Sequence, residues 1–273
     1  MTNRNELANL ILKRLEEVKG TVQIQFDETK SKIGYFFVDD LLPVEVALQL
    51  SHSFPETSQM VLKKSIREDK FIGVQMNKYD LLLEETIYAF QDERVVQLVS
   101  EITGLPNVFP DQQLYAGGIS LMKKGQYLNP HLDNSHDKDR ERWRVLNLLY
   151  YVTPNWNLKN GGNLELWPNG LKKKQVLIES KFNRLAVMVT HNQSLHSVSP
   201  VTEELERRCI SNYYFSNIPA RQDDTFHVTS FRGRPENKFV DMVLQTDTFL
   251  RMGIRKIFKK GIKENPHYYK KGN

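Results

Sequence analysis

The spacing of apolar residues changes near residue 114. Before that point they recur at helical intervals. In residues 4–18 the leucine, isoleucine and valine positions follow an i, i+3, i+4 rhythm, which predicts an amphipathic helix. Asn3, with Glu6 three residues later, is typical of a helix N-terminal cap. The first part of the chain is therefore expected to begin with a capped helix.

Further elements follow before residue 110. Ile33 to Val38 is an apolar run of strand length, and Pro43 can start a helix that continues to Leu50. Tyr79 to Thr103 is helical in pattern, as two helices broken near Gln91-Asp92, and Gly104 ends it. We expect these helices to brace one face of a sheet.

After residue 114 short strand-like runs alternate with turn signals such as Asn160-Gly161-Gly162. The runs are Leu114–Met122, Val145–Val152, Asn163–Trp167, Gln175–Glu179, Arg184–Val189 and Cys209–Phe215. Many short strands at this spacing predict a sandwich, barrel or double-sheet jelly roll. A helix-like stretch, Val240–Phe258, comes last.

These patterns divide the chain into three regions. Residues 1–110 are a lead-in of helices and strand packed on the core, residues 111–220 are the β core, and residues 221–273 are an extension with a basic helical end. The predicted class is mainly β with flanking helices. At 273 residues, the length is that of one large domain or one domain with additions.

Composition narrows the class of protein. Hydrophobic residues make up 40% of the chain and charged residues 26%, as in soluble globular proteins. No apolar run approaches the roughly 18 residues of a membrane span, and no signal-peptide core is present at the N-terminus. The single cysteine, Cys209, excludes an internal disulfide framework and favours a reducing compartment. We therefore predict a cytoplasmic protein that does not enter membranes.

The net charge of +5 is concentrated in part at the C-terminal end. Between Arg251 and Lys271 there are eight Lys or Arg and one acid, Glu264. Such a stretch is either a solvated helix end or a contact to RNA or DNA. Both interpretations stay open from the sequence.

Candidate chemistry is centred on the stretch Gly125 to Asp133. In an extended backbone His131 and Asp133 point to the same side, so both can reach one metal ion. His196 is a third candidate ligand, with His191 as its competitor. Two histidines and one carboxylate form the facial triad of non-haem Fe(II) oxygenases, which leaves positions open for O2 and a co-substrate.

A possible anion site follows downstream. In a strand, Arg207, Cys209, Ser211 and Tyr213 share one face. An inward-facing arginine among small residues needs an anion, because an unpaired buried charge is costly. A dicarboxylate would supply that anion. The alternative is that Arg207 and Arg208 lie at a solvated strand start.

Taken together, these segments resemble the 2-oxoglutarate- and Fe(II)-dependent dioxygenase superfamily, in its prolyl 4-hydroxylase-like branch. The likeness covers roughly residues 115–216. The matching segments are Gly125–Asp133, Arg144–Val152, Gly161–Trp167, His196–Val201 and Arg207–Phe215. The resemblance implies a double-stranded β-helix core of the jelly-roll or cupin-like type, with the N-terminal helices bracing one sheet.

The resemblance also implies roles for individual residues. Iron would be held by His131, Asp133 and His196, Arg207 would pair with the far carboxylate of 2-oxoglutarate, and Tyr127 would donate its hydroxyl to the same co-substrate. Ascorbate is the reductant it suggests. Two positions depart from the family pattern. Glu203–Glu206 stands where a glycine is usual, with the spacing from His196 to Arg207 one residue longer, and Asn163 replaces a frequent glutamate.

The longer spacing keeps Arg208 as a rival for the co-substrate carboxylate. Asp133 favours hydroxylation, since related halogenases lack this carboxylate.

The predicted function is hydroxylation of an unactivated C–H bond, with O2 and 2-oxoglutarate as co-substrates. The substrate would be a prolyl residue in a peptide, an amino acid or another small molecule. Three alternatives remain: a nucleic-acid oxidative demethylase, a zinc-dependent hydrolase and a non-catalytic jelly-roll binding protein. No substrate-binding residue is assigned from the sequence.

Overall fold

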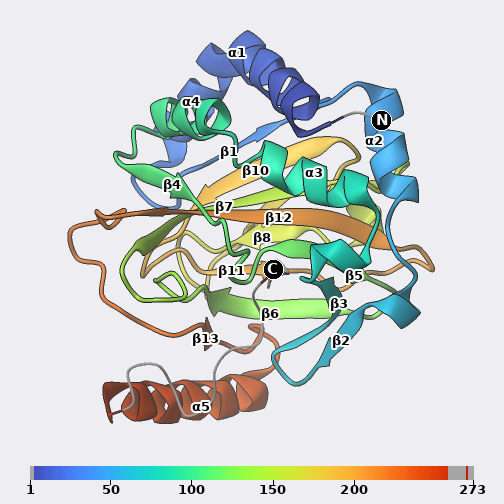
Figure 1. Cartoon of the computed structure of the whole chain (residues 1–273). Helices are drawn as coiled ribbons and strands as arrows, with labels where there is room; N and C mark the ends of the chain where they lie inside the picture. The colour runs from blue at the N-terminus through green and yellow to red at the C-terminus, as the bar shows by residue number, and fades with distance from the viewer. Residues whose placement is uncertain (1–2, 258–268, 270–273) are drawn as a thin grey trace.

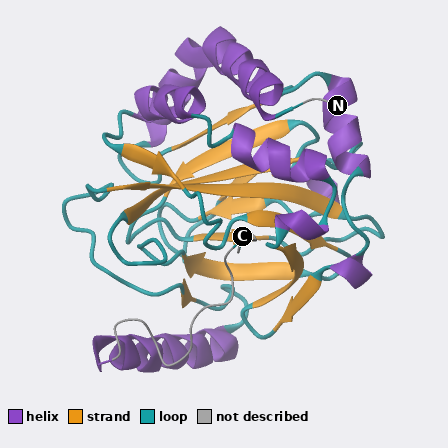
Figure 2. Cartoon of the chain, viewed as in Figure 1, coloured by secondary structure: helices purple, strands orange, loops and turns teal. Residues whose placement is uncertain are grey.

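The computed structural model describes residues 3–257 and residue 269 (Figure 1). Most of its helices come before residue 104, and strands make up most of the described chain after that point (Figure 2). The helices are α1 (Arg4–Thr29), α2 (Val44–His52), α3 (Leu81–Ala89), α4 (Glu93–Thr103) and α5 (Lys238–Ile257). The strands before the core are β1 (Tyr35–Val38), β2 (Val61–Lys64), β3 (Glu68–Gly73) and β4 (Val108–Pro110). The remaining strands are β5 (Gly118–Met122), β6 (Tyr127–Leu132), β7 (Trp143–Tyr151), β8 (Leu164–Leu166), β9 (Val176–Ile178), β10 (Arg184–Val189), β11 (His196–Val198), β12 (Arg207–Ser216) and β13 (Ser230–Phe231).

All the strands of the described part belong to one antiparallel sheet that curls on itself. Hydrogen-bonded neighbours follow the order β1-β10-β7-β12-β5-β3-β6-β11-β8-β9, and β13, β2 and β4 pair with β6, β3 and β12. Strands far apart in sequence therefore lie side by side. This curled sheet with flanking helices is the double-stranded β-helix architecture expected from the sequence.

The helices form a layer on one side of the sheet. Helix α1 packs against α3, α4 and β1, and α3 reaches β12, whereas α5 lies at the other side of the molecule next to β13 (Figure 1). The main hydrophobic core lies between α1, α3, α4 and the sheet, with Leu7, Ile11 and Tyr150 fully buried. The predicted bracing of one sheet by the N-terminal helices is confirmed.

Helix α1 extends well beyond the predicted end at residue 18. The capping box of Asn3 and Glu6 starts it as expected. Its apolar stripe continues at helical spacing through the buried Val22 and Phe26. Gly20 lies inside the helix and has open space around its Cα, so it interrupts neither the backbone nor the packing. The break between α3 and α4 falls at the predicted place, and Gly104 ends α4 in the left-handed conformation with φ 66°.

The hairpin formed by β2 and β3 was not predicted. Its apolar residues Val61 and Leu62 are exposed, so the hairpin lacks the alternation that marks a half-buried strand. Strand β3 lies between β5 and β6 and pairs with both. A segment N-terminal to residue 111 therefore completes the middle of the sheet.

Strand β6 contains a β-bulge that changes which of its side chains face inward. In the β6–β11 pairing His196 lies opposite His131, and Val198 opposite Leu128. The three residues His196–Val198 of β11 thus lie opposite the four residues Leu128–His131 of β6, so the bulge inserts one residue at Asn129-Pro130. Because side chains alternate with a period of two, one inserted residue moves those before it to the other face.

The helices of the described residues include none with the length and apolarity needed to cross a bilayer. The predicted basic end, from Arg251 to Lys271, lies mostly outside the described residues.

A glycine at the junction of β3 and β5 gives a test of the sheet order. Gly118 has φ 121°, and a Cβ there would lie 2.4 Å from the carbonyl oxygen of Gly73. We expect Gly118→Ala to reduce the free energy of unfolding by about 2 kcal/mol or more, measured by urea denaturation, because backbone must move apart. Gly170→Ala is the matched control: φ is 73° but a Cβ meets open space, so its loss should stay near about 1 kcal/mol. Equal losses would contradict the β3–β5 contact.

Candidate metal and co-substrate site

Three side chains predicted to bind metal converge inside the curled sheet. His131 is on β6, Asp133 directly follows that strand, and His196 opens β11. The paired strands set His196 opposite His131. One ligand atom from each of the three residues lies within 4.8 Å of the others. The two His Nε2 atoms are each 3.6 Å from a carboxylate oxygen of Asp133.

The backbone fixes which nitrogen of each histidine faces the carboxylate. Nδ1 of His131 lies 2.9 Å from the carbonyl oxygen of Asn129, and Nδ1 of His196 lies 2.9 Å from that of Ser194. A carbonyl can only accept, so each Nδ1 carries a proton and Nε2 is the nitrogen that each ring can offer to a metal. This second-layer hydrogen bond is the arrangement that metal-binding histidines use. Cis ligands around one octahedral ion lie about 3 Å apart, so the three residues fit such an ion after a small contraction.

Asp133 is held ionised. Burial alone would raise its pKa, but the His131 contact and the charge of Arg144 outweigh burial and lower the pKa well below its usual range. Arg144 is buried, and its Nη1 is 3.7 Å from Asp133 Oδ1. Its guanidinium lies over the Tyr213 ring, 4.0 Å from the centroid. Asn147 also donates to Asp133, at 3.4 Å. Sequence reasoning gave neither Arg144 nor Asn147 a role.

His196 is held neutral. Burial and the neighbouring His131 lower its pKa to about 4, so the imidazole is available as a ligand at neutral pH. Its competitor His191 lies elsewhere. Nε2 of His191 bonds the carbonyl of Lys32, and its Nδ1 accepts from the amide of Gln193. Both ring nitrogens of His191 thus make hydrogen bonds to the backbone. The fold brings His196, and not His191, next to His131 and Asp133.

The C-terminal extension supports the two histidines. Phe231 on β13 stacks on His131, with ring centroids 5.1 Å apart at 20°. Arg234 donates to the carbonyl of Val198 on β11 and pairs with the buried Glu165 at 2.9 Å. Through these contacts Phe231 and Arg234 hold β6 and β11, the strands that carry the candidate histidine ligands.

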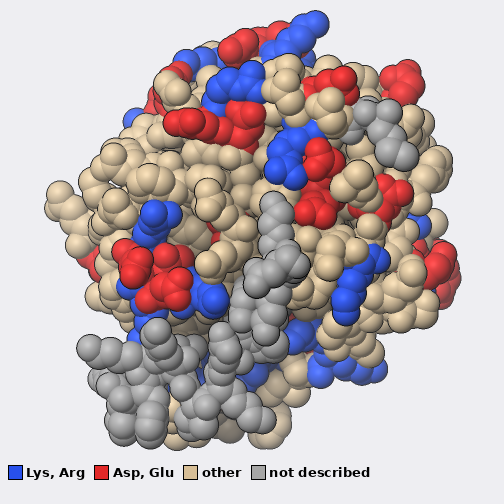
Figure 3. Space-filling view, viewed as in Figure 1, with Lys and Arg blue, Asp and Glu red and all other residues tan. Residues whose placement is uncertain are grey.

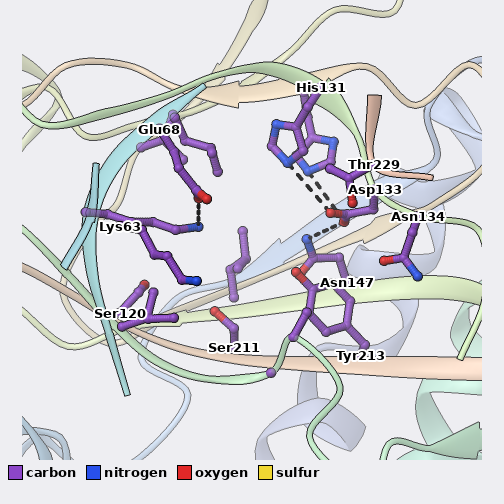
Figure 4. A pocket seen from close by; sticks show the side chains of 18 of the residues that line it. Lys63, Glu68, Ser120, His131, Asp133, Asn134, Asn147, Ser211, Tyr213 and Thr229 are labelled. Atoms are coloured by element: carbon purple, nitrogen blue, oxygen red, sulfur yellow. Dashed lines mark hydrogen bonds and ion pairs between the residues drawn. The ribbon is translucent and has the colours of Figure 1, made fainter. Parts of the chain in front are cut away.

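A cavity of about 560 Å³ opens beside these residues. His131, Asp133 and Asn147 lie on one side of it, and Lys63 and Glu68 on the other (Figure 4). Its wall includes the inward side chains of β12, which are Arg207, Cys209, Ser211 and Tyr213. The predicted shared face of this strand is therefore what the structure shows. A cavity of this volume has the size of a small-molecule site.

Arg207 and Arg208 point to opposite sides of β12. Arg207 is buried and lines the cavity, with Nε 3.1 Å from Ser180 Oγ. Within the described part of the chain, no carboxylate lies within 4.0 Å of its guanidinium. Arg208 instead donates to the carbonyl of Ser51 and pairs with Glu206 at 2.9 Å. A buried guanidinium beside a cavity, without a carboxylate, suits an incoming anion.

Tyr127 is not brought to the cavity. Its hydroxyl is directed to the carbonyl of Ser65, at 3.4 Å, on the outer side of β6. The bulge is the reason: Leu128 and His131 line the cavity, so Tyr127 faces away. A different tyrosine lies beside Arg207. The Tyr151 ring is 4.8 Å from the guanidinium carbon of Arg207, and the residue is fully buried. Its hydroxyl has no hydrogen-bond partner among the described residues.

A signal for Tyr151 was present in the sequence. Asn147, Leu149 and Tyr151 alternate along β7, and a polar Asn within an apolar run marks the face that looks into a site.

The structure also explains why two glycines occur in the Gly161-Gly162 turn. Gly162 has φ 62°, and a Cβ there would lie 2.8 Å from Cδ of Arg207. The glycine therefore lets the turn close over the arginine.

Comparison with known proteins agrees with this site. Residues 117–215 match the family model described as the 2OG-Fe(II) oxygenase superfamily. This segment spans β5 to β12, and it includes His131, Asp133, His196 and Arg207. A search of curated proteins found no match.

Solved structures of the same fold include prolyl hydroxylases. A prolyl 4-hydroxylase from Pseudomonas putida aligns with a TM-score of 0.54 at 14% identity, covering 71% of this chain and 98% of that one. A prolyl 4-hydroxylase from Phytophthora capsici aligns with a TM-score of 0.53 at 17% identity, covering 90% and 80%. A prolyl hydroxylase from Trichoplax adhaerens, in complex with a hypoxia-inducible-factor peptide fragment, aligns at 0.50 and 21% identity, covering 74% and 92%.

The fold and the family match together define the class. Residues 117–215 are similar to the 2OG-Fe(II) oxygenase superfamily, and the fold of the chain is the one found in the solved prolyl 4-hydroxylases.

The buried histidines predict how stability depends on pH. Burial lowers the pKa of His191 to about 4, below its value of about 6.5 in the unfolded chain. Between these values the unfolded chain binds more protons, so stability falls as pH falls from 6.5 to 4. We expect metal-free protein to lose about 1–3 kcal/mol of unfolding free energy over this window, measured by urea denaturation with a chelator present.

The unfolding free energy of the variant His191→Gln should fall less over the same pH window. In the parent protein Nδ1 of His191 accepts a hydrogen bond from the Gln193 amide, and a proton on Nδ1 would break that bond, whereas glutamine does not titrate. His52→Gln, at the exposed end of α2, is the control and should keep the full loss. An unchanged pH dependence in His191→Gln would show that this histidine is not held neutral.

Proposed function

We propose that this protein is an Fe(II)- and 2-oxoglutarate-dependent dioxygenase. It hydroxylates an unactivated C–H bond of a prolyl residue, an amino acid or another small molecule, with Fe(II) held by His131, Asp133 and His196. The observation that carries the proposal is their convergence in one cavity, with both Nε2 atoms facing an ionised carboxylate. When bound, the iron supplies the position at which O2 is reduced while 2-oxoglutarate is converted to succinate and CO2.

The residues of the chain have separate roles in this proposal. The backbone carbonyls of Asn129 and Ser194 hold Nδ1 of both histidines, so that Nε2 faces the metal position. Arg144 keeps Asp133 ionised and oriented. Arg207 binds the far carboxylate of 2-oxoglutarate, supported by its burial and by the lack of a carboxylate beside it among the described residues. The Tyr151 hydroxyl donates to the same group, in place of the Tyr127 predicted from the resemblance.

Two further parts of the proposal concern the surroundings of the enzyme. Ascorbate would serve as the reductant that returns oxidised iron to Fe(II). The cytoplasm is the proposed compartment, supported by the single cysteine, Cys209, which is buried and free. The alternative of a zinc hydrolase would leave Arg207 without a function.

Turnover of 2-oxoglutarate without substrate tests the ligand assignment. Protein reconstituted with Fe(II) under anaerobic conditions and then exposed to O2 should release succinate slowly. Asp133→Ala and His196→Ala should reduce succinate to the background of free iron, since each removes one ligand. Arg207→Ala should keep iron binding but raise the 2-oxoglutarate KM about 10- to 100-fold, the value of a charge-assisted bidentate contact.

Arg208→Ala is the matched control, because its side chain is directed to Ser51 and Glu206. Its KM should stay within about twofold of the parent value. A rise in KM from Arg208→Ala alone, or full succinate release by Asp133→Ala, would refute the assignment.

A pair of tyrosine variants separates the two candidate hydroxyls. Tyr151→Phe should raise the 2-oxoglutarate KM about 3- to 10-fold, because one hydrogen bond to a carboxylate is lost while the ring stays in place. Tyr127→Phe should leave the KM unchanged, since its hydroxyl lies on the outer side of β6. Steady-state assays with melting temperatures as a fold control would measure both. The opposite ranking would restore Tyr127 and contradict the orientation of β6.

A further inference from the structure

The β2–β3 hairpin turns three charged side chains into the cavity. Lys63, Glu68 and Lys70 all line it, on the side opposite His131 and Asp133 (Figure 4). Lys63 and Lys70 are direct partners across the two strands. Like charges at such opposed positions destabilise a hairpin, since their Cβ atoms lie about 5 Å apart. An unfavourable pair on the inner face points to a function in the cavity.

One carboxylate is not enough for two lysines. Lys70 Nζ lies 3.1 Å from Glu68 Oε2, so that pair is made. Lys63 has no carboxylate within 4.0 Å in the part of the chain that the structure describes. The two lysines nonetheless both lower the pKa of Glu68 against the effect of its burial, so both charges act on the same space.

The other cations of the cavity wall are matched. Arg251 on α5 pairs with Asp247 at 2.9 Å, and Arg207 faces the proposed 2-oxoglutarate carboxylate. Lys63 is therefore the described lining cation left without an anion once iron and co-substrate are bound. The substrate is the remaining component that can bring one.

The same strand carries a natural comparison. Lys64 is the next residue and points outward, with 73% of its side chain exposed and Asp69 3.9 Å away. The hairpin from Val61 to Gly73 contains four basic and two acidic residues. In Figure 3 basic side chains gather at the lower right, where this hairpin lies. Such a field raises the local concentration of anions near the entrance.

We propose that the substrate carries a carboxylate, which binds Lys63 at the hairpin side of the cavity while the C–H bond to be hydroxylated lies toward His131 and Asp133. The carboxylate is either that of a free amino acid or that of an acidic residue beside a prolyl residue in a peptide. This inference rests on the proposed function and narrows its substrate class. Lys63 is a specificity-determining residue in it, and it binds neither iron nor co-substrate.

The proposal is tested by measuring the binding of matched probes. The protein is loaded with Mn(II) in place of Fe(II), so that no turnover takes place, and with saturating 2-oxoglutarate. N-acetyl-L-proline is compared with N-acetyl-L-prolinamide for the free-acid source. The acetylated, amidated dipeptide Pro-Glu is compared with Pro-Gln for the peptide source. Isothermal titration should give a Kd about tenfold lower for the acid than for the amide in at least one pair, the value of one charge-assisted contact at a half-buried site.

The variants give the direction of the effect. Lys63→Gln should abolish the preference, and Lys63→Glu should reverse it, so that the amide binds more tightly. Lys64→Gln should keep the preference, because that side chain faces away from the cavity. Melting temperatures should not fall in any of the three, since both Lys63 variants remove the like-charge pair with Lys70 and Lys64 is exposed.

Equal affinity of acid and amide in both pairs, including the absence of binding by either, would overturn the proposal. So would a rise in the 2-oxoglutarate KM of Lys63→Gln in the substrate-free succinate assay, which would make Lys63 a co-substrate residue. Failure of the proposed function has a different signature: wild-type protein with Fe(II) would then release no succinate, whatever the probes do with the Mn(II) form.

Discussion

The register between β6 and β11 is the constraint on which the site depends. It sets His196 directly opposite His131, although 65 positions separate them in sequence. A slip of one residue would turn one imidazole to the other face of the sheet and remove the candidate metal site. Contacts on both sides hold the register. Phe231 stacks on His131, and Arg234 is anchored to the carbonyl of Val198 and to Glu165.

Electrostatic matching inside the curled sheet organises the remainder of the cavity. Asp133 stays ionised at depth because Arg144 and the contact from His131 lower its pKa against the effect of burial, and His196 stays neutral because burial lowers its own pKa. At two positions this matching is incomplete in the protein itself. Arg207 lies deep beside Tyr151, and Lys63 lies on the hairpin across the cavity. Each implies an anion that arrives with a ligand, and the two positions are on different strands.

The parts of the fold that were predicted correctly are those with a local signal. The capping box of α1, the break between α3 and α4 and the alternation on β12 are written in neighbouring residues. The β2–β3 hairpin has no such signal. Val61 and Leu62 of β2 are exposed. Strand β2 forms because it pairs with β3, and β3 is held in place by pairing with β5 and β6. That pairing joins segments about 50 residues apart, and no window of sequence contains it.

The sequence by itself determined the class of fold, the helices and strands that have a local signal, and three side chains that could share a metal, because periodicity and the His-x-Asp spacing act over a few residues. Only the tertiary structure shows which side chains of like chemistry face the cavity or lie beside Arg207: Arg207 and not Arg208, Lys63 and not Lys64, Tyr151 and not Tyr127. Each choice depends on which face of a strand looks inward. A single bulge or a distant pairing partner sets that face, and neither can be read from the residues themselves.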